Sequence, residues 1–229
     1  MLKLTPKPLG SKMALWLAFS ALLACSLVLA KANLDRMHSL ALSRYGQETA
    51  ATVAQWQLLI ANIEALSDRE KLTQVNDFFN TRIRFVQDID TWNQLDYWAT
   101  PLETMGRGQG DCEDFSIAKF ATLLLAGVDM DRLRITYVKA RTGGPNGDIQ
   151  VAHMILAYYP TPSAEPLILD NLIMRILPAS QRDDLTPVFG FNSKGLWVGG
   201  STAPASKNPG AKLSRWRDLI QRMEQDGLG

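Results

Sequence analysis

The chain changes its hydrophobic pattern near Gly127. Before this glycine, apolar residues recur every three or four positions, as in the stripe of Val53, Trp56 and Ile60, which is typical of amphipathic helices. After it, short apolar runs bounded by glycine and proline predict strands. Because these strands follow one another without long helices between them, we expect them to pair antiparallel. The sequence therefore predicts an α+β fold in which a helical lobe precedes an antiparallel sheet.

The boundaries of the expected elements follow from local signals. Ser67 and Glu70 have the spacing of a capping box, which opens the third helix. Residues 91–110 are rich in tryptophan, proline and glycine without a period, so an ordered and functional loop is expected there. Residues 203–209 are expected to form a linker. Helices are predicted over residues 34–45, 48–66, 67–85, 115–126 and 213–225, and strands over 133–139, 150–159, 167–170 and a short pair within 189–198.

The first 32 residues have the composition of an export leader. Three lysines precede an apolar stretch over residues 13–30, and Ala30-Lys31-Ala32 has the small-x-small pattern of a cleavage site. This predicts a signal peptide over residues 1–32 and a single domain over residues 33–229. The apolar run is also just long enough for an uncleaved membrane anchor. A third alternative is lipidation at Cys25, which follows a lipoprotein-like box. All three would carry the rest of the chain across a membrane.

The charge balance gives no support for nucleic-acid binding. The net charge of the whole chain is +1, but four of the basic residues lie in the leader, which holds no acid. The remaining chain carries 20 basic and 23 acidic residues. A slightly acidic body has no electrostatic attraction to phosphate, so no nucleic-acid partner is expected.

Cys112 is the one cysteine outside the leader. A lone cysteine in an exported protein is either a small buried residue or a residue kept for chemistry. Two glycines precede it, and Asp111 is a good N-cap, which places Cys112 in the first turn of a helix. There the unpaired backbone N–H groups and the helix dipole favour a thiolate and can stabilise an oxyanion. This predicts a nucleophile at a helix N-terminus.

A cysteine nucleophile needs a base, and two histidines are available. His38 lies in the first expected helix, whereas His153 lies in the middle of an apolar strand. Asp170 ends the next long apolar strand, where a carboxylate could orient an imidazole or simply begin a turn. Each residue alone has a purely structural explanation. Together, Cys112, His153 and Asp170 occur in the order that papain-like and transglutaminase-like enzymes use.

Three acids surround the cysteine, namely Asp111, Glu113 and Asp114. Acids are common in the first turn of a helix, where they cap it and complement its dipole. They also raise the pKa of a neighbouring thiol and so oppose its activation. A bound Ca²⁺ would resolve this conflict, because calcium takes oxygen ligands and is abundant outside the cytoplasm. From the spacing alone, capping and calcium binding both remain open.

Longer motifs contain these residues. They read Asp90-x-Trp92-x-x-x-Asp96-Tyr97-Trp98-Ala99-Thr100-Pro101-x-Glu103 and Gly108-x-Gly110-Asp111-Cys112-Glu113-Asp114-Phe115-x-Ile117-Ala118-Lys119, with Val75-Asn76-x-Phe78-Phe79-Asn80 upstream. These runs closely resemble the LapG family, the bacterial transglutaminase-like cysteine proteinases. The resemblance extends downstream to His153 and Asp170, so it covers most of the chain after the leader.

The resemblance implies a fold, an activity and partners. It implies a papain/transglutaminase-like core and a periplasmic, calcium-dependent endopeptidase, with Cys112, His153 and Asp170 as the triad and the acids around Asp111 and Glu113 as calcium ligands. The substrate would be a large surface adhesin, cut near its N-terminus at a di-alanine site, which releases the adhesin and disperses the biofilm. The periplasmic domain of an inner-membrane cyclic-di-GMP receptor of the LapD type would hold the enzyme inactive. Lipidation at Cys25 would depart from this family.

Two other classes of function stay open on the sequence. A transglutaminase or peptidoglycan amidase would acylate the same thiolate, and a calcium-dependent binding module would leave Cys112 unreactive. The aromatic pair Tyr97 and Trp98 offers a hydroxyl and an indole N–H as candidates for a second oxyanion donor. The same two side chains could instead anchor their loop to the core.

Overall fold

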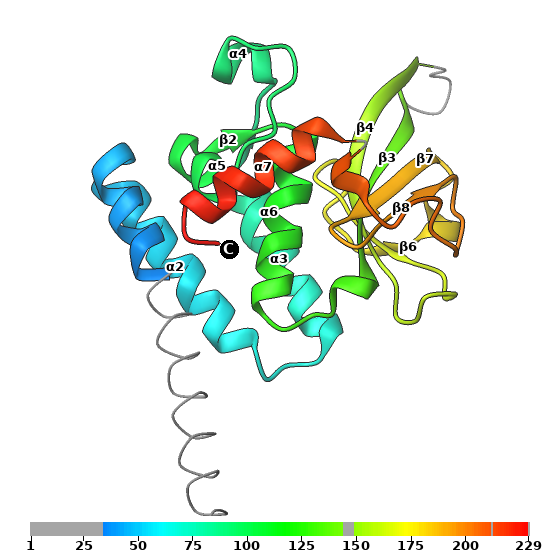
Figure 1. The fold of residues 1–229 in the computed structure, drawn as a ribbon, viewed down its shortest axis with the longest axis horizontal. Coiled ribbons are helices and arrows are strands. Elements are labelled where there is room, and N and C mark those ends of the chain that lie inside the picture. Colours follow the sequence, from blue (N-terminus) through cyan, green and yellow to red (C-terminus); the bar gives the residue numbers. More distant parts are fainter. Residues whose placement is uncertain (1–33, 144–148, 212, 229) are drawn as a thin grey trace, which may run out of the picture.

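The computed structural model describes residues 34–143, 149–211 and 213–228 (Figure 1). The expected leader, with its alternatives of signal peptide, anchor and lipidated Cys25, lies outside the described residues. Within the described part of the chain, none of the helices combines the length and the apolar character that crossing a membrane requires.

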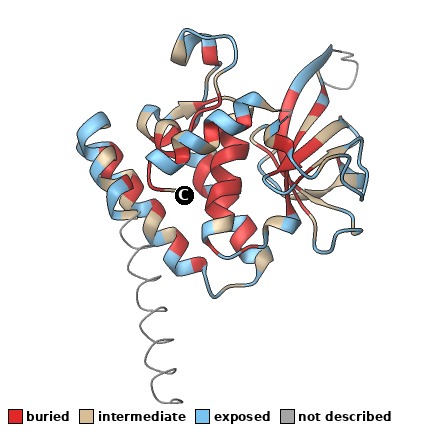
Figure 2. Cartoon of the chain, in the orientation of Figure 1, coloured by how far each residue is buried: buried red, intermediate tan, exposed pale blue. Residues whose placement is uncertain are grey.

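The helical lobe surrounds one central helix, α6 (Cys112–Leu125). In Figure 1, α6 lies between the other helices and the sheet, and its residues from Asp114 to Leu123 are buried (Figure 2). Most of these residues are apolar, and a helix with apolar residues on all sides of its surface is stable in such a buried position. The helices around it are residues 34–45, α2 (Gln47–Ile63), α3 (Asp68–Arg82), α5 (Pro101–Arg107) and α7 (Ser214–Gln225).

The sheet has six strands, in the order β6-β5-β4-β3-β7-β8, and each described pair is antiparallel. The helical lobe followed by this sheet confirms the predicted α+β fold. Strand β6 and the full length of β7 were not expected. The strands are β3 (Leu133–Thr142), β4 (Ile149–Tyr158), β5 (Leu167–Leu169), β6 (Leu177–Pro178), β7 (Leu185–Asn192) and β8 (Gly195–Val198).

Alternation along β4 divides the apolar residues between two clusters. Met154 and Leu156 belong to the main core, which the sheet shares with α6, whereas Ile155 and Ala157 belong to a smaller cluster with Ile168. The first four residues of β4 are exposed, whereas the stretch from His153 to Tyr158 is buried. The sheet and the two clusters therefore enclose the second half of β4, which begins with His153.

The expected loop over residues 91–110 is wrong for its second half, which contains α5 and a short strand. Thr100 caps α5 by accepting from the backbone of Glu103, and Pro101 occupies the first turn, where a missing N–H costs nothing. Strand β2 (Gln109–Gly110) then pairs parallel with β1 (Arg84–Phe85). This pairing also ends the third helix at Arg82 instead of residue 85.

The expected linker over residues 203–209 is also wrong in part. The backbone N–H of Leu196 in β8 donates to the carbonyl of Ser206 at 2.9 Å, and Pro209 is buried. This segment therefore attaches to the sheet and leads the chain back to α7.

Candidate active site

Cys112 is the first residue of α6, at the position predicted for the nucleophile. The β1–β2 pair fixes the chain immediately before it, with Phe85 opposite Gly110. A Cβ at Gly110 would lie 2.6 Å from Oδ2 of Asp114, which accepts the backbone N–H of Asp111 at 3.3 Å. Glycine is therefore required at position 110 for the turn that starts the helix.

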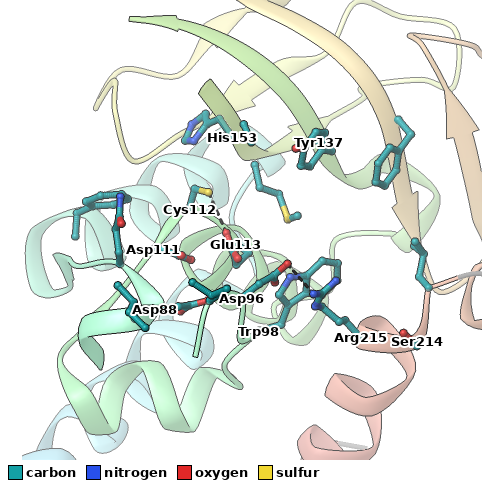
Figure 3. A pocket seen from close by; sticks show the side chains of 18 residues that line it. Asp88, Asp96, Trp98, Asp111, Cys112, Glu113, Tyr137, His153, Ser214 and Arg215 are labelled. Atoms are coloured by element: carbon teal, nitrogen blue, oxygen red, sulfur yellow. Dashed lines mark hydrogen bonds and ion pairs between the residues drawn. The ribbon is translucent and has the colours of Figure 1, made fainter. Parts of the chain in front are cut away.

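His153 and Asp170 meet on neighbouring strands. Leu156 of β4 pairs with Leu169 of β5, which places the residue after β5 beside His153. The Nε2 atom of His153 lies 2.8 Å from Oδ1 of Asp170, and both side chains are almost completely buried. In Figure 3 the sulfur of Cys112 points toward the strand that carries His153.

The protonation state of Asp170 determines which nitrogen of His153 carries the proton. Burial alone would raise the pKa of Asp170, but hydrogen bonds from His153, the Leu172 backbone and Arg182 bring it down to about 2. An ionised carboxylate can only accept, so the N–H lies on Nε2 and donates to Asp170. The Nδ1 atom of His153 is then free to accept a proton from a thiol.

Cys112 and His153 line a cleft of about 540 Å³ between the helical lobe and the sheet (Figure 3). Apolar side chains from three regions form much of its wall, among them Ile89, Leu95, Tyr137, Met154 and Phe189. The start of α7 closes one side with Leu213, Ser214 and Arg215. His38 does not line this cleft.

Five carboxylates gather beside the thiol, two more than the sequence indicated. Asp88, in α4 (Asp88–Trp92), comes within 4.8 Å of Asp111 and Asp114, and it forms a second such group with Asp96 and Glu113. Asp88 and Asp96 are distant from Cys112 in sequence, so sequence spacing alone did not reveal them. The one sequence feature that could have indicated these two additional acids was the acidic and aromatic motif around Asp96.

In this acidic cluster of Asp88, Asp96, Asp111, Glu113 and Asp114, the four aspartates have raised pKa values. Burial, followed by the charge of Glu113, raises the pKa of Asp111 to about 10, and burial raises the pKa of Asp88 to about 6. The Oδ1 atoms of Asp88 and Asp111 are buried without a hydrogen-bond partner among the described residues. Crowded oxygen donors with unpartnered lone pairs fit a hard cation such as Ca²⁺.

Asp114 differs from the other acids because both of its oxygens already accept backbone hydrogen bonds. Oδ1 accepts the N–H of Ala99 at 2.8 Å, and Oδ2 accepts that of Asp111. Asp114 therefore fastens the 91–100 segment to α6. Of the predicted ligands, Asp111 and Glu113 have the freer oxygens, and Asp88 and Asp96 add to them.

The same cluster keeps Cys112 protonated. Burial, and then the charge of Glu113, raise the pKa of the thiol well above its ordinary value, whereas the backbone N–H of Met154 lowers it. The sulfur donates to Oε2 of Glu113 at 3.0 Å. A thiol bonded to a carboxylate is a poor nucleophile, so Glu113 must be drawn away before Cys112 can react.

Of the two candidate oxyanion donors, Tyr97 is placed as an anchor of its loop. Its hydroxyl donates to Glu103 at 2.8 Å and accepts from Arg222 at 3.1 Å, and the side chain does not line the cleft. Trp98 does line the cleft, and its ring stacks on Phe191 at a centroid distance of 5.6 Å. Its role as an oxyanion donor stays a prediction.

Two comparisons with known proteins, one with family models and one with solved structures, agree with this geometry. Residues 42–184 match the family described as bacterial transglutaminase-like cysteine proteinase BTLCP. A solved structure of Legionella pneumophila LapG is 40% identical, with a TM-score of 0.70 over 83% of this chain and 97% of that one. The calcium-bound and EGTA-treated forms of Legionella pneumophila LapG are also 40% identical over 83% of this chain, each with a TM-score of 0.71, and cover 98% and 97% of their own chains. A search by sequence among curated proteins gives no match.

Proposed function

The chain belongs to the bacterial transglutaminase-like cysteine proteinases, and on that premise we propose a specific activity for this cysteine protease. It is a calcium-dependent endopeptidase of the periplasm that cleaves a large surface adhesin near its N-terminus, at a di-alanine site. Cleavage releases the adhesin and disperses the biofilm. The observation that carries the proposal is the buried His153–Asp170 pair in one cleft with Cys112 and the acidic cluster.

In the proposed reaction, the triad forms and breaks one acyl-enzyme. Nδ1 of His153 takes the thiol proton, and the sulfur of Cys112 attacks the carbonyl carbon of the scissile bond. The leaving amine takes the proton back from His153, and the acyl group stays on the sulfur as a thioester. Water then attacks the thioester with His153 as base, which releases the carboxylate and restores the thiol. Asp170 orients the imidazole and stabilises its positive form throughout.

The residues present fit a calcium ion, and calcium is part of the proposal. Two solved relatives support it, because one form of Legionella pneumophila LapG is calcium-bound and another is EGTA-treated. The unpartnered oxygens of Asp88 and Asp111, with Glu113 and Asp96, would hold the ion. When bound, it would offset negative charge beside Cys112 and so favour the thiolate.

The shape and chemistry of the cleft support a peptide substrate with small side chains. Tyr137, Met154 and Phe189 line the cleft together with Cys112, and their bulk favours small substrate residues such as alanine. The exposed apolar side chains Phe85, Ile89 and Leu95 line the same cleft. Apolar side chains exposed at the mouth of a cleft suit contact with another protein. They support both a protein substrate and the proposed receptor, the periplasmic domain of a LapD-type cyclic-di-GMP receptor.

The proposed periplasmic location rests on the composition of the first 32 residues, where lysines precede an apolar stretch and a small-x-small site. A calcium site in the mature protein is consistent with export, because calcium is abundant outside the cytoplasm. Fractionation of cells that express the full chain tests this proposal. Recovery of the protein in the cytoplasmic fraction would overturn it.

The activity is tested by incubating the purified protein with N-terminal fragments of candidate adhesins that contain a di-alanine site. We expect one defined cut, found by mass spectrometry, that disappears with Cys112→Ala and in excess EGTA and returns with added Ca²⁺. Adding a primary amine separates the hydrolase from a transglutaminase, because only the latter would yield amine-linked product. Cleavage by Cys112→Ala would overturn the nucleophile assignment, and full activity in EGTA would overturn the calcium requirement.

The receptor proposal has its own test. A receptor that recognises the surface of the enzyme does not need the thiol, so Cys112→Ala should still be retained by the receptor's periplasmic domain in a pull-down. Loss of binding with Cys112→Ala alone would mean that the receptor acts as a substrate mimic in the cleft.

A further inference from the structure

Asp170 has a second charged partner, which the proposed reaction does not use. Its Oδ1 faces His153, and its Oδ2 accepts a hydrogen bond from Nη2 of Arg182 at 2.7 Å. The Arg182 side chain is only 1% exposed, so this ion pair is closed off from solvent. A buried ion pair brings little net stability because both charges lose their hydration. Stability alone is therefore a weak reason for this arginine.

Arg182 is itself held by Asp184. Its Nε donates to Oδ1 of Asp184 at 2.9 Å, and its Nη2 donates to Oδ2 at 2.8 Å. This two-pronged contact fixes the plane of the guanidinium, which a lysine could not reproduce. Asp184 also balances the charge of the arginine, so that Asp170 keeps its negative charge for His153.

The backbone of Asp170 is fixed by other residues, whereas its carboxylate is held by the Leu172 N–H, which donates to Oδ1 at 3.1 Å, and by Arg182 at Oδ2. The Asp170 carbonyl accepts from Nδ2 of Asn80 at 2.7 Å and from Nζ of Lys119 at 3.1 Å. These bonds place the Cα atom but do not set the rotation of the carboxylate. With Oδ2 bound to Arg182, Oδ1 is the oxygen that faces His153.

We propose that Arg182, anchored by Asp184, is a positioning residue for the His153–Asp170 pair, an inference that rests on the proposed triad. Together with the Leu172 N–H, it sets the rotation of the Asp170 carboxylate, and it keeps that carboxylate ionised in a buried site. Asp170 then accepts the Nε2–H of His153 and leaves Nδ1 free for the thiol proton. The low pKa of Asp170 agrees, because burial opposes ionisation and the hydrogen bonds from His153, Leu172 and Arg182 outweigh it.

The test compares Arg182→Met and Arg182→Lys with a matched control, Arg134→Met. Arg134 is a second buried arginine of the same sheet, which donates to the Ser201 carbonyl and lies between the rings of Tyr159 and Trp197, away from the cleft. The readouts are kcat and KM for a di-alanine peptide that the wild type cleaves, near-UV circular dichroism for the fold, and the imidazole N–H resonance of His153 in protein labelled with ¹⁵N-histidine.

We expect Arg182→Met to lower kcat by about 10–100-fold, the usual effect of losing a group that orients a functional side chain, with KM changed less than about twofold. The N–H resonance of His153 should weaken through exchange with solvent. Arg182→Lys should recover part of kcat, and Arg134→Met should leave kcat and the resonance as in the wild type. In an Asp170→Asn background, adding Arg182→Met should lower kcat by less than about a further twofold, because Arg182 acts through Asp170.

A folded Arg182→Met protein with wild-type kcat and an unchanged His153 resonance would overturn the proposal. So would an equal loss in the wild-type and Asp170→Asn backgrounds. If Arg182→Met does not fold, Arg182→Lys becomes the test variant. A wild-type kcat and an unchanged His153 resonance in Arg182→Lys would overturn the positioning role of Arg182. An active Cys112→Ala protein would instead refute the proposed function, whereas an inactive Cys112→Ala beside a fully active Arg182→Met would refute only the positioning role.

Discussion

Among single residues, Asp88 shows how strongly the acidic cluster depends on a compensating charge. Its Oδ1 is buried without a described partner, and its Oδ2 accepts the backbone N–H of Tyr97. Burial and the neighbouring charges of Glu113 and Asp96 raise its pKa to about 6. At neutral pH the ionised form is therefore costly in the absence of a cation.

Asp88→Asn should have opposite effects with and without calcium. In excess EGTA at neutral pH, loss of the buried charge should stabilise the protein by about 2–3 kcal/mol, in line with the rise of the Asp88 pKa from 3.8 to about 6. When Ca²⁺ is added in excess, it should raise the melting temperature of Asp88→Asn less than it raises that of the wild type, because the variant lacks one proposed calcium ligand. Calorimetry in both conditions measures this, with the exposed Asp183→Asn as control. An undiminished calcium effect in Asp88→Asn would exclude Asp88 from the ligand set.

The sequence predicted Cys112, His153 and Asp170 because each has a residue type and a local setting that the chemistry requires. Asp88 and Arg182 could not be found in the same way. An acid at the start of a short helix and an arginine after a turn are ordinary surface residues by sequence. They become site residues only because β1–β2 pairing and the β5–β6 connection bring them to the cleft and to Asp170.

At the scale of elements, α6 carries a buried lysine as well as the nucleophile. Lys119 lies two turns after Cys112, is 1% exposed, and donates to the Asp170 carbonyl. Burial lowers its pKa from 10.5 to about 7, because the charge of Asp170 only partly compensates for the lost hydration. The helix therefore folds with an amine that releases its proton on folding above neutral pH.

This predicts a pH-dependent stability difference between the wild type and Lys119→Met. Above pH 10.5 the amine is neutral in both the folded and unfolded chain, and its cost is absent. As pH falls toward 7 the unfolded chain binds the proton more readily, so the wild type loses stability relative to Lys119→Met by up to about 1.4 kcal/mol per pH unit. Urea unfolding of both proteins between pH 7 and 10 measures the difference. A constant difference across this range would mean that Lys119 is charged in the folded protein.

Element α5 has a clear N-terminal capping pattern in the sequence but no helical periodicity. Thr100, Pro101 and Glu103 form a complete capping box with proline in the first turn, and these residues were visible in the sequence. A helix of only seven residues, however, is too short to show a 3.6-residue period. The position of the edge strands β6 and β8 in the sheet could not be predicted from the sequence for a different reason. It depends on pairing between distant segments.

At the scale of the whole molecule, α7 joins the helical lobe to the sheet. Trp216 is 2% exposed and packs edge-on against Phe120 of α6 and Phe191 of β7. Arg222 donates to Glu103 at 2.6 Å and to the Trp98 carbonyl at 2.7 Å. The last helix thus holds both the 91–100 segment and the wall of the cleft.

Trp216→Ala should lower the free energy of unfolding by about 3–5 kcal/mol, the usual cost of removing a large buried aromatic side chain. The substitution should also reduce cleavage, because Leu213, Ser214 and Arg215, which precede Trp216 in the chain, line the cleft. Urea unfolding and the peptide assay measure both effects. Leu58→Ala, at an exposed position of α2, is the control and should change stability by less than about 0.5 kcal/mol. A Trp216→Ala protein as stable as this control would show that α7 is not part of the cooperative unit.

The position of α7 also has a consequence for the order of events during synthesis. Ribosomes make the chain from its N-terminus, so Cys112, His153 and Asp170 exist well before the helix that completes their cleft. A nascent chain that ends anywhere before Arg215 lacks one wall of the site and the cation that pairs with Asp96 at 3.0 Å. The protease therefore gains its complete cleft only once α7 has been made, so a nascent chain that has not reached α7 cannot present the finished site to a neighbouring protein.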